Sequence, residues 1–250
     1  MDLWLLVLFL VVVQPILGYY RFRRLAGGRD VLPTRRKLVI YATIVVTEWI
    51  LVGVCALVLH RRELEIADLG LGQPGIETLL LGAMAAAAFS YATVVNARRF
   101  ARTEWDSVPS HVRKVARILP ANGIESLGFV PVALTAGFCE EVLFRGFLFF
   151  AFHQIMPSVF LALAATSVVF GFAHSYQGPR GVVTTGILGG LLAALYWYSG
   201  SLWPGIALHA IIDLASGIAL GRLPRPGVGA AQPPDREAAG APLESEASTR

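Results

Sequence analysis

The chain has 250 residues, of which 55% are hydrophobic and 15% are charged, and its mean hydropathy is +0.61. A soluble domain carries about 25% charged residues. The apolar residues here gather into runs of membrane-spanning length and do not alternate as barrel strands do. The sequence therefore predicts an all-α, polytopic transmembrane helical bundle. The formal net charge of +4 is concentrated in two loops, which indicates membrane topology and argues against a nucleic-acid partner.

The apolar runs predict about seven spans. In chain order these are Leu3–Tyr20, Leu38–Leu59, Ile76–Val95, Gly128–His153, Ser158–His174, Val182–Tyr198 and Gly205–Leu220. The first run has no basic segment before it and no small-residue cleavage site after it, so we expect a retained anchor. In the sixth run, Gly186, Gly190 and Ala194 predict a tightly packed helix.

Two basic loops predict the orientation of these spans. The cations of the first loop are Arg21, Arg23, Arg24, Arg29, Arg35, Arg36 and Lys37, against the single acid Asp30. The second loop, from Ala97 to Asn122, has a similar excess and is expected to contain an interfacial helix around His111–Ile118. By the positive-inside rule both loops are cytoplasmic, which places the N-terminus outside and the C-terminus inside.

We expect three regions along the chain. Residues 1–117 form an N-terminal three-span region with basic cytoplasmic loops, and residues 118–221 form a core of four spans. Residues 222–250 are rich in Pro, Ala and Glu without apolar periodicity, which predicts a disordered cytoplasmic tail. The two cysteines, Cys55 and Cys139, fall in predicted spans and give no disulfide framework.

Charged residues are scarce in the last four spans, and those present form a motif. Glu140, Glu141 and Arg145 lie inside an apolar run, where an ionisable residue is costly unless it is paired or faces a wet cavity. Glu141 and Arg145 are four residues apart and share a helix face, so they can pair. Glu140 lies about 100° away around the helix and lacks that partner. The motif therefore suggests a working carboxylate beside a held one, or alternatively a single packing network.

Two further motifs follow on later spans. His174 closes the span that contains Phe170, although a lone histidine at a helix end is also a common interfacial residue. His209 and Asp213 share a helix face, the usual geometry of an acid that fixes a histidine tautomer. At the helical rise, Glu140 and His174 both lie roughly 20–25 Å from the turn between them, whereas His209 lies only about 9 Å past its own turn. The three meet only if that turn is recessed or the helices tilt strongly.

The three motifs together resemble the CPBP family of intramembrane proteases, which contains the type II CAAX prenyl endopeptidases and the bacterial Abi proteins. They read Glu140-Glu141-x-x-x-Arg145, Phe170-x-x-x-His174 and His209-x-x-x-Asp213, in the family order. The resemblance covers about Leu127–Leu220 and implies hydrolysis of a peptide bond within the membrane. It implies that Glu140 is the general base with His174 assisting, that His209 and Asp213 bind the carbonyl oxygen, and that Glu141 and Arg145 support them.

Asp213 stands where the family also has asparagine. An ionised aspartate cannot donate to an oxyanion, so we expect Asp213 to orient His209, with His209 as the donor; a protonated Asp213 is the alternative. A zinc ion is a second open question, because Glu140, His174 and His209 form a two-histidine, one-carboxylate set with room for a fourth ligand. The motifs are accounted for without zinc, so the metal-free form is preferred.

Two other classes of function remain as alternatives. The first is a non-catalytic membrane scaffold or immunity-type protein that keeps the fold. The second is a proton-coupled transporter that uses Glu48, Glu140 and Asp213 as a proton path. Glu48 also has a structural interpretation, an interhelical hydrogen bond. For the protease we expect membrane lipid and a peptide or lipidated protein as partners, and a bacterial cytoplasmic membrane as the location.

Overall fold

The computed structural model describes residues 2–26, 32–72, 75–100, 102, 108 and 110–223. All regular elements within these ranges are helices, which confirms the predicted all-α class. The tail predicted for residues 222–250 falls outside the described residues from position 224 onward, and part of each basic loop is outside them as well.

All seven predicted apolar runs are helical. The elements in chain order are α1 (Leu3–Leu8), the π-helix η1 (Phe9–Val13), α2 (Gln14–Ala26), α3 (Thr34–His60), η2 (Ile66–Leu69), α4 (Ile76–Phe100), α5 (Ser110–Ala116), α6 (Gly123–Glu140), the π-helix η4 (Glu141–Leu148), α7 (Phe149–His153), α8 (Val159–Ala173), η5 (Ser175–Gln177), α9 (Pro179–Ser199) and α10 (Trp203–Gly221). By length and composition, 6 helical segments of the described chain can cross a membrane, and α8 is a shorter apolar helix.

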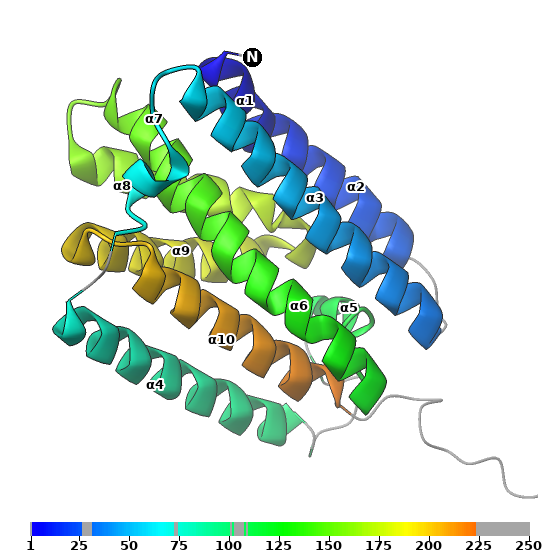
Figure 1. Ribbon diagram of the computed structural model, residues 1–250. Helices are drawn as coiled ribbons and strands as arrows, with labels where there is room; N and C mark the ends of the chain where they lie inside the picture. Colours follow the sequence, from blue (N-terminus) through cyan, green and yellow to red (C-terminus); the bar gives the residue numbers. More distant parts are fainter. Residues whose placement is uncertain are drawn as a thin grey trace, which may run out of the picture.

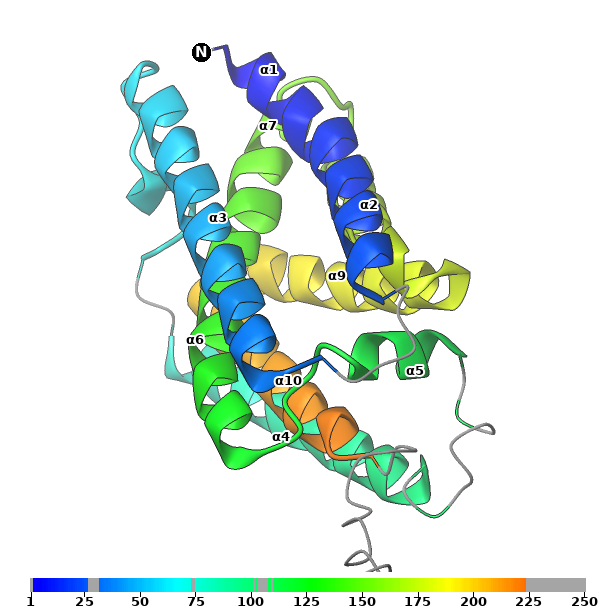
Figure 2. The same ribbon diagram turned by 90° about the vertical axis from the view of Figure 1, so that its right-hand side faces the viewer.

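The long helices lie in a row with a second group behind it. Figure 1 shows α1–α2, α3, α6, α10 and α4 following one another across the molecule, and the principal contacts are α3 with α6, α6 with α10, and α10 with α4. Helices α8 and α9 pack against each other behind this row, and α9 crosses the direction of α3 steeply (Figure 2). The extensive packing of α9 on α8 agrees with its predicted small-residue face. Gly186 lies so close to Gly171 that a Cβ on Gly171 would stand 3.1 Å from the Gly186 Cα.

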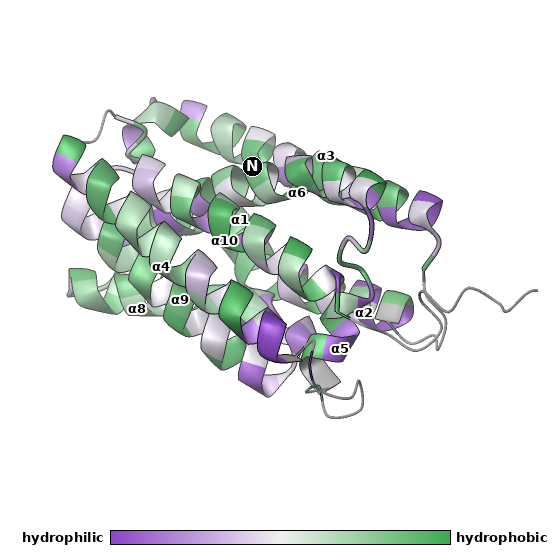
Figure 3. Ribbon diagram, turned by 90° about the horizontal axis from the view of Figure 1, so that it is seen from below, coloured by the Kyte–Doolittle hydropathy of each residue, from purple (hydrophilic) through white to green (hydrophobic). Residues whose placement is uncertain are grey.

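The surface of the bundle is that of a membrane protein. Hydrophobic residues cover the sides of the helices, whereas hydrophilic residues gather at helix ends and on α5 (Figure 3). Large apolar side chains such as Ile50, Met84 and Phe160 are exposed by 59%, 64% and 70%, as expected for residues that face lipid. Helix α5 lies within the segment predicted to hold an interfacial helix.

A buried ion pair joins the N-terminal ends of α3 and α6. Lys37 Nζ donates to Glu125 Oε2 at 2.7 Å and to the Leu119 carbonyl oxygen at 2.9 Å, and both side chains of the pair are nearly inaccessible. Thr34 Oγ1 donates to the second Glu125 oxygen at 2.7 Å. By sequence Lys37 belongs to the first basic loop, but it lies in the first turn of α3, and Glu125 neutralises its charge. The remaining arginines of that loop still carry the orientation argument.

The turn between α9 and α10 is recessed beneath another part of the chain. Leu202 N donates to the Gly70 carbonyl oxygen at 2.7 Å, Ser201 Oγ to the Gly72 oxygen at 2.9 Å, and Trp203 Nε1 to the Leu71 oxygen at 2.9 Å. Gly70 has φ +103°, and a Cβ there would lie 2.7 Å from the Tyr196 ring, so only glycine fits. The segment after η2 thus covers this turn and holds it inside the bundle.

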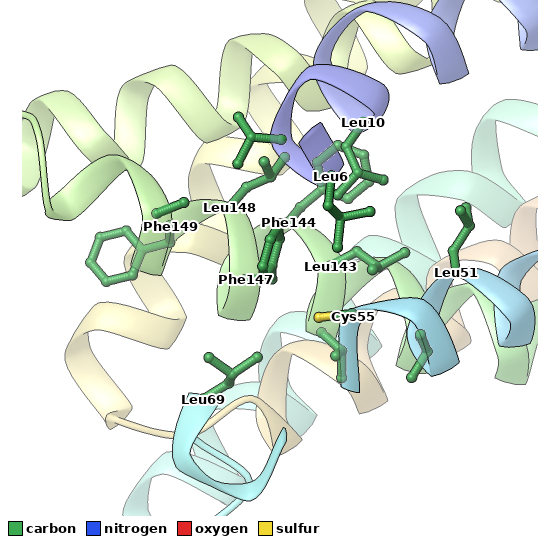
Figure 4. Close-up of a cluster of buried hydrophobic side chains, with 14 of the residues drawn as sticks. Leu6, Leu10, Leu51, Cys55, Leu69, Leu143, Phe144, Phe147, Leu148 and Phe149 are labelled. Carbon is green, nitrogen blue, oxygen red and sulfur yellow. The ribbon is translucent and has the colours of Figure 1, made fainter. Parts of the chain in front are cut away.

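The main hydrophobic core surrounds η4. Four side chains close on η4, whose Phe144 and Phe147 point among them (Figure 4): Leu6 from α1, Leu10 from η1, and Leu51 and Cys55 from α3. Every residue of η4 is buried. The segment that carries the acidic motif is therefore held on several sides by apolar packing.

Candidate active site

The acidic motif lies where α6 passes into a π-helix. Glu140 is the last residue of α6, and Glu141 is the first residue of η4. π-helical turns are uncommon and frequently occur at functional sites. The predicted pair forms here: Arg145 Nη1 donates to Glu141 Oε1 at 2.8 Å, and each side chain is 1% exposed.

The Arg145 guanidinium is surrounded by fixed partners. Its Nη2 donates to the Gly189 carbonyl oxygen at 3.2 Å, and its Cζ lies 4.0 Å from the centroid of the Phe170 ring. A Cβ on Gly189 would stand 3.1 Å from Nη2, so glycine allows this close approach of α9. Phe170, predicted as a supporting residue, thus makes a cation–π contact with Arg145.

His209 is oriented by Glu141, which differs from the sequence expectation. His209 Nδ1 lies 2.8 Å from Glu141 Oε1, a hydrogen bond in which the ring nitrogen donates to the carboxylate. Asp213 Oδ2 is 3.8 Å from His209 Nε2, beyond hydrogen-bond distance. Helical spacing alone suggested Asp213 as the orienting acid, but Glu141 reaches the ring from another helix. A Cβ on Gly205 would lie 3.2 Å from Glu141 Oε2, so the glycine leaves room for this carboxylate beside α10.

Glu140 faces both histidines. Its Oε2 lies 3.9 Å from His174 Nε2 and 3.9 Å from His209 Nε2. The His174 ring is fixed by its Nδ1, which donates to the Phe170 carbonyl oxygen at 2.9 Å. Glu140 Oε2 is buried without a hydrogen-bond partner among the described residues. Glu140 is thus the unpaired carboxylate of the motif, as predicted.

The depth difficulty for His209 is resolved by the recessed turn. Because residues 69–72 cover the start of α10, the helix begins inside the bundle and its second turn, which carries His209, reaches the level of Glu140. The equal distances from Glu140 to His174 and His209 follow from this arrangement. The structure therefore brings Glu140, His174, His209 and Asp213 together.

A cavity of about 500 Å³ opens beside Glu140 and His174. Its walls come largely from α2 and α3, and they include Glu48. Glu48 forms no hydrogen bond within the described part of the chain, so its interhelical interpretation finds no support there. Tyr176, in η5, also lines the cavity, and its ring centroid lies 5.7 Å from that of His174. Burial raises the pKa of the Tyr176 hydroxyl, which therefore stays protonated as a neutral group.

A metal ion needs several ligands arranged around one point. In the described residues, no group of three or more His, Cys, Asp and Glu side chains is placed to hold one. The Nδ1 atoms of both histidines are already bonded, so only their Nε2 atoms face Glu140.

These side chains define a membrane-embedded, carboxylate–histidine site on a helical bundle. Residues 123–215 match the family model described as type II CAAX prenyl endopeptidase Rce1-like. The match confirms the resemblance to the CPBP family over this segment and supports, at family level, a membrane-embedded endopeptidase. Comparison with curated proteins gave no match, and comparison with solved structures gave none either.

Sequence reasoning missed three features of this region. All three depend on residues that are far apart in the chain. They are the Glu141–His209 hydrogen bond, the Lys37–Glu125 ion pair and the cavity wall that α2 forms beside the site. Glu48, Glu141 and His209 each carried a local signal, a polar side chain inside an apolar run. Nothing in the sequence shows which of these side chains meet in the folded chain.

Proposed function

We propose that the protein is an intramembrane endopeptidase that hydrolyses a peptide bond of a membrane-associated or lipidated peptide or protein, with water activated by Glu140. The observation that carries this proposal is the 3.9 Å separation between Glu140 Oε2 and His174 Nε2. Two acceptors cannot bond to each other directly, but at this distance both can accept from one shared water molecule. His174 Nε2 is an acceptor in the neutral ring because Nδ1 carries the proton that bonds Phe170.

The reaction then follows ordinary acid–base chemistry. Glu140 takes a proton from the water while the water oxygen adds to the carbonyl carbon of the scissile bond. The resulting tetrahedral oxyanion collapses, the C–N bond breaks, and Glu140 returns the proton to the leaving nitrogen. The products are a new carboxyl group and a new amino group. His174 holds the water in line with the carbonyl carbon.

His209 is proposed to stabilise the oxyanion. Its Nδ1–H is directed to Glu141, so its Nε2 donates a hydrogen bond only when the ring carries both protons. The carboxylates of Glu140, Glu141 and Asp213 all lie within 4 Å of the ring nitrogens, at 3.9, 2.8 and 3.8 Å. Glu141 and Arg145 hold the ring and balance the charge.

Asp213→Asn should retain substantial activity, whereas His209→Ala should lower kcat by about 10²–10³-fold, the usual effect of removing an oxyanion donor. The reason is that Glu141, and not Asp213, fixes the His209 ring. The measurement is kcat of the purified variants in lipid nanodiscs, with circular dichroism as the control for folding. The reverse ranking of the two variants would contradict this assignment.

The site is proposed to work without a metal, because no group of three or more His, Cys, Asp and Glu side chains among the described residues is placed to hold one. The Nδ1 hydrogen bonds of His174 and His209 are compatible with either form, since they leave both Nε2 atoms available. Protein purified without a His-tag should contain zinc well below one equivalent by mass spectrometry of the metals. Its activity should also survive a chelator. Stoichiometric zinc that is lost together with activity would instead favour the alternative in which Glu140, His174 and His209 are zinc ligands.

The proposed location is a bacterial cytoplasmic membrane. The proposed protease activity is tested by comparing all protein N-termini in membranes that contain wild type or Glu140→Gln. The protease should produce new N-termini that the variant lacks. A scaffold would keep its phenotype in the Glu140→Gln, His174→Ala double variant, and a transporter would show proton-coupled flux in proteoliposomes.

A further inference from the structure

The cavity beside Glu140 is built mainly by the first two long helices. Both lie outside the segment that matches the protease family. The cavity separates α2 from α3, and Figure 2 shows these helices diverging toward the side of α5. Most of its wall is apolar, with Leu17, Phe22, Ile40 and Ile44 among the lining residues. A part of the chain without any catalytic motif thus forms the space in front of the catalytic residues.

The inner end of the cavity is acidic. Helices α3 and α6 run in parallel register, since Lys37 pairs with Glu125 near their starts and the Trp49 ring stacks on Phe138 at 5.4 Å further along. In this register Glu48 lies about one helical turn, roughly 5 Å, to the cytoplasmic side of Glu140. Both carboxylates line the cavity.

The mouth of the cavity is basic. Arg21 and Arg24 both line it, are exposed, and pair with no acid among the described residues. Between them in sequence, the Phe22 ring packs on Tyr176 at 4.8 Å, and Tyr176 packs on His174 at 5.7 Å. The mouth therefore lies within the reach of a few extended residues from the catalytic histidine. Arg23 is different, because it bends back over its own helix to the Tyr19 ring at 5.5 Å and does not line the cavity.

We propose that Arg21 and Arg24 bind the C-terminal carboxylate of the substrate peptide and so determine which chain ends enter the site. When the scissile bond lies beside Glu140, the part of the peptide that follows it can run along the apolar wall toward Arg21 and Arg24. Their guanidinium groups match a carboxylate in geometry and charge. After cleavage, the released fragment carries a new amino group at the inner end, where Glu48 faces it. The inference rests on the proposed function for the position of the scissile bond.

The test measures binding, so that it does not depend on cleavage. The probe is a short leucine- and valine-rich peptide with a fluorescein label at its N-terminus, prepared as the free acid and as the C-terminal amide. Its Kd is measured by fluorescence anisotropy on Glu140→Gln in nanodiscs of zwitterionic lipid. The free acid should bind about tenfold more tightly than the amide, the usual size of a charged hydrogen-bond effect. Adding Arg21→Gln and Arg24→Gln together should abolish this preference, and adding Arg23→Gln, the matched control, should preserve it.

Three results would overturn the inference. One is equal affinity for the acid and the amide. Another is an equal effect of Arg23→Gln, which would indicate general charge attraction. The third combines two observations: the preference for the free acid disappears in nanodiscs with anionic lipid, and Arg21 and Arg24 bind that lipid tightly. This result would assign the arginines to lipid head groups. Failure of the proposed function has a different signature, because Glu140→Gln would then leave the N-termini of membrane proteins unchanged while the binding preference is still measurable.

Discussion

Glu140→Gln should abolish measurable turnover without changing stability, whereas the same change at the adjacent Glu141 should destabilise the fold. Loss of a general base lowers kcat by about 10²–10⁴-fold. Glu140 has no hydrogen bond to lose at Oε2. Glu141, in contrast, is 1% exposed and accepts from both Arg145 and His209 at 2.8 Å. The measurements are kcat and the thermal midpoint in the same detergent.

The comparison is sharp because the two substitutions are chemically identical and one residue apart. Glu140→Asp is the matched control, since it keeps the carboxylate but withdraws it from the water position. We expect it to keep the wild-type midpoint and a small residual activity. A stability loss in Glu140→Gln as large as that in Glu141→Gln would contradict the division between a chemical and a structural glutamate.

Arg145→Met should lower the free energy of unfolding by about 3–5 kcal/mol, the usual cost of leaving one member of a buried ion pair without its partner. The substitution also removes the hydrogen bond to Gly189 and the contact with the Phe170 ring. Because Glu141 then bonds His209 alone, activity should fall together with stability. Unfolding in mixed micelles with increasing denaturing detergent provides the measurement.

The double variant Glu141→Gln, Arg145→Met separates charge from packing. Replacing both members of a buried pair is often far less costly than replacing one, so the double variant should be more stable than Arg145→Met. Arg145→Lys should be intermediate, since it keeps the charge but cannot bond Glu141 and Gly189 with a planar fork. A double variant no more stable than Arg145→Met would show that packing around Phe170, and not charge pairing, is the dominant contribution.

The sequence by itself determined the class of fold and the identity of the motif residues. An apolar run long enough to span a bilayer becomes helical because unbonded backbone groups are costly in hydrocarbon. All seven predicted runs are helical. The pairing of Glu141 with Arg145 was also predictable, because helical spacing fixes which near neighbours share a face. The free carboxylate of Glu140 followed from the same geometry.

Tertiary structure decided which distant groups meet. The partner of His209 is Glu141 and not its helical neighbour Asp213, because α10 packs against α6 and η4 with its start held inside the bundle by residues 69–72. The Lys37–Glu125 pair and the cavity between α2 and α3 likewise depend on how separate helices cross. Spacing along one helix is encoded locally, whereas the depth and crossing of neighbouring helices are set by packing of the whole bundle, so only the structure could place His209 level with Glu140.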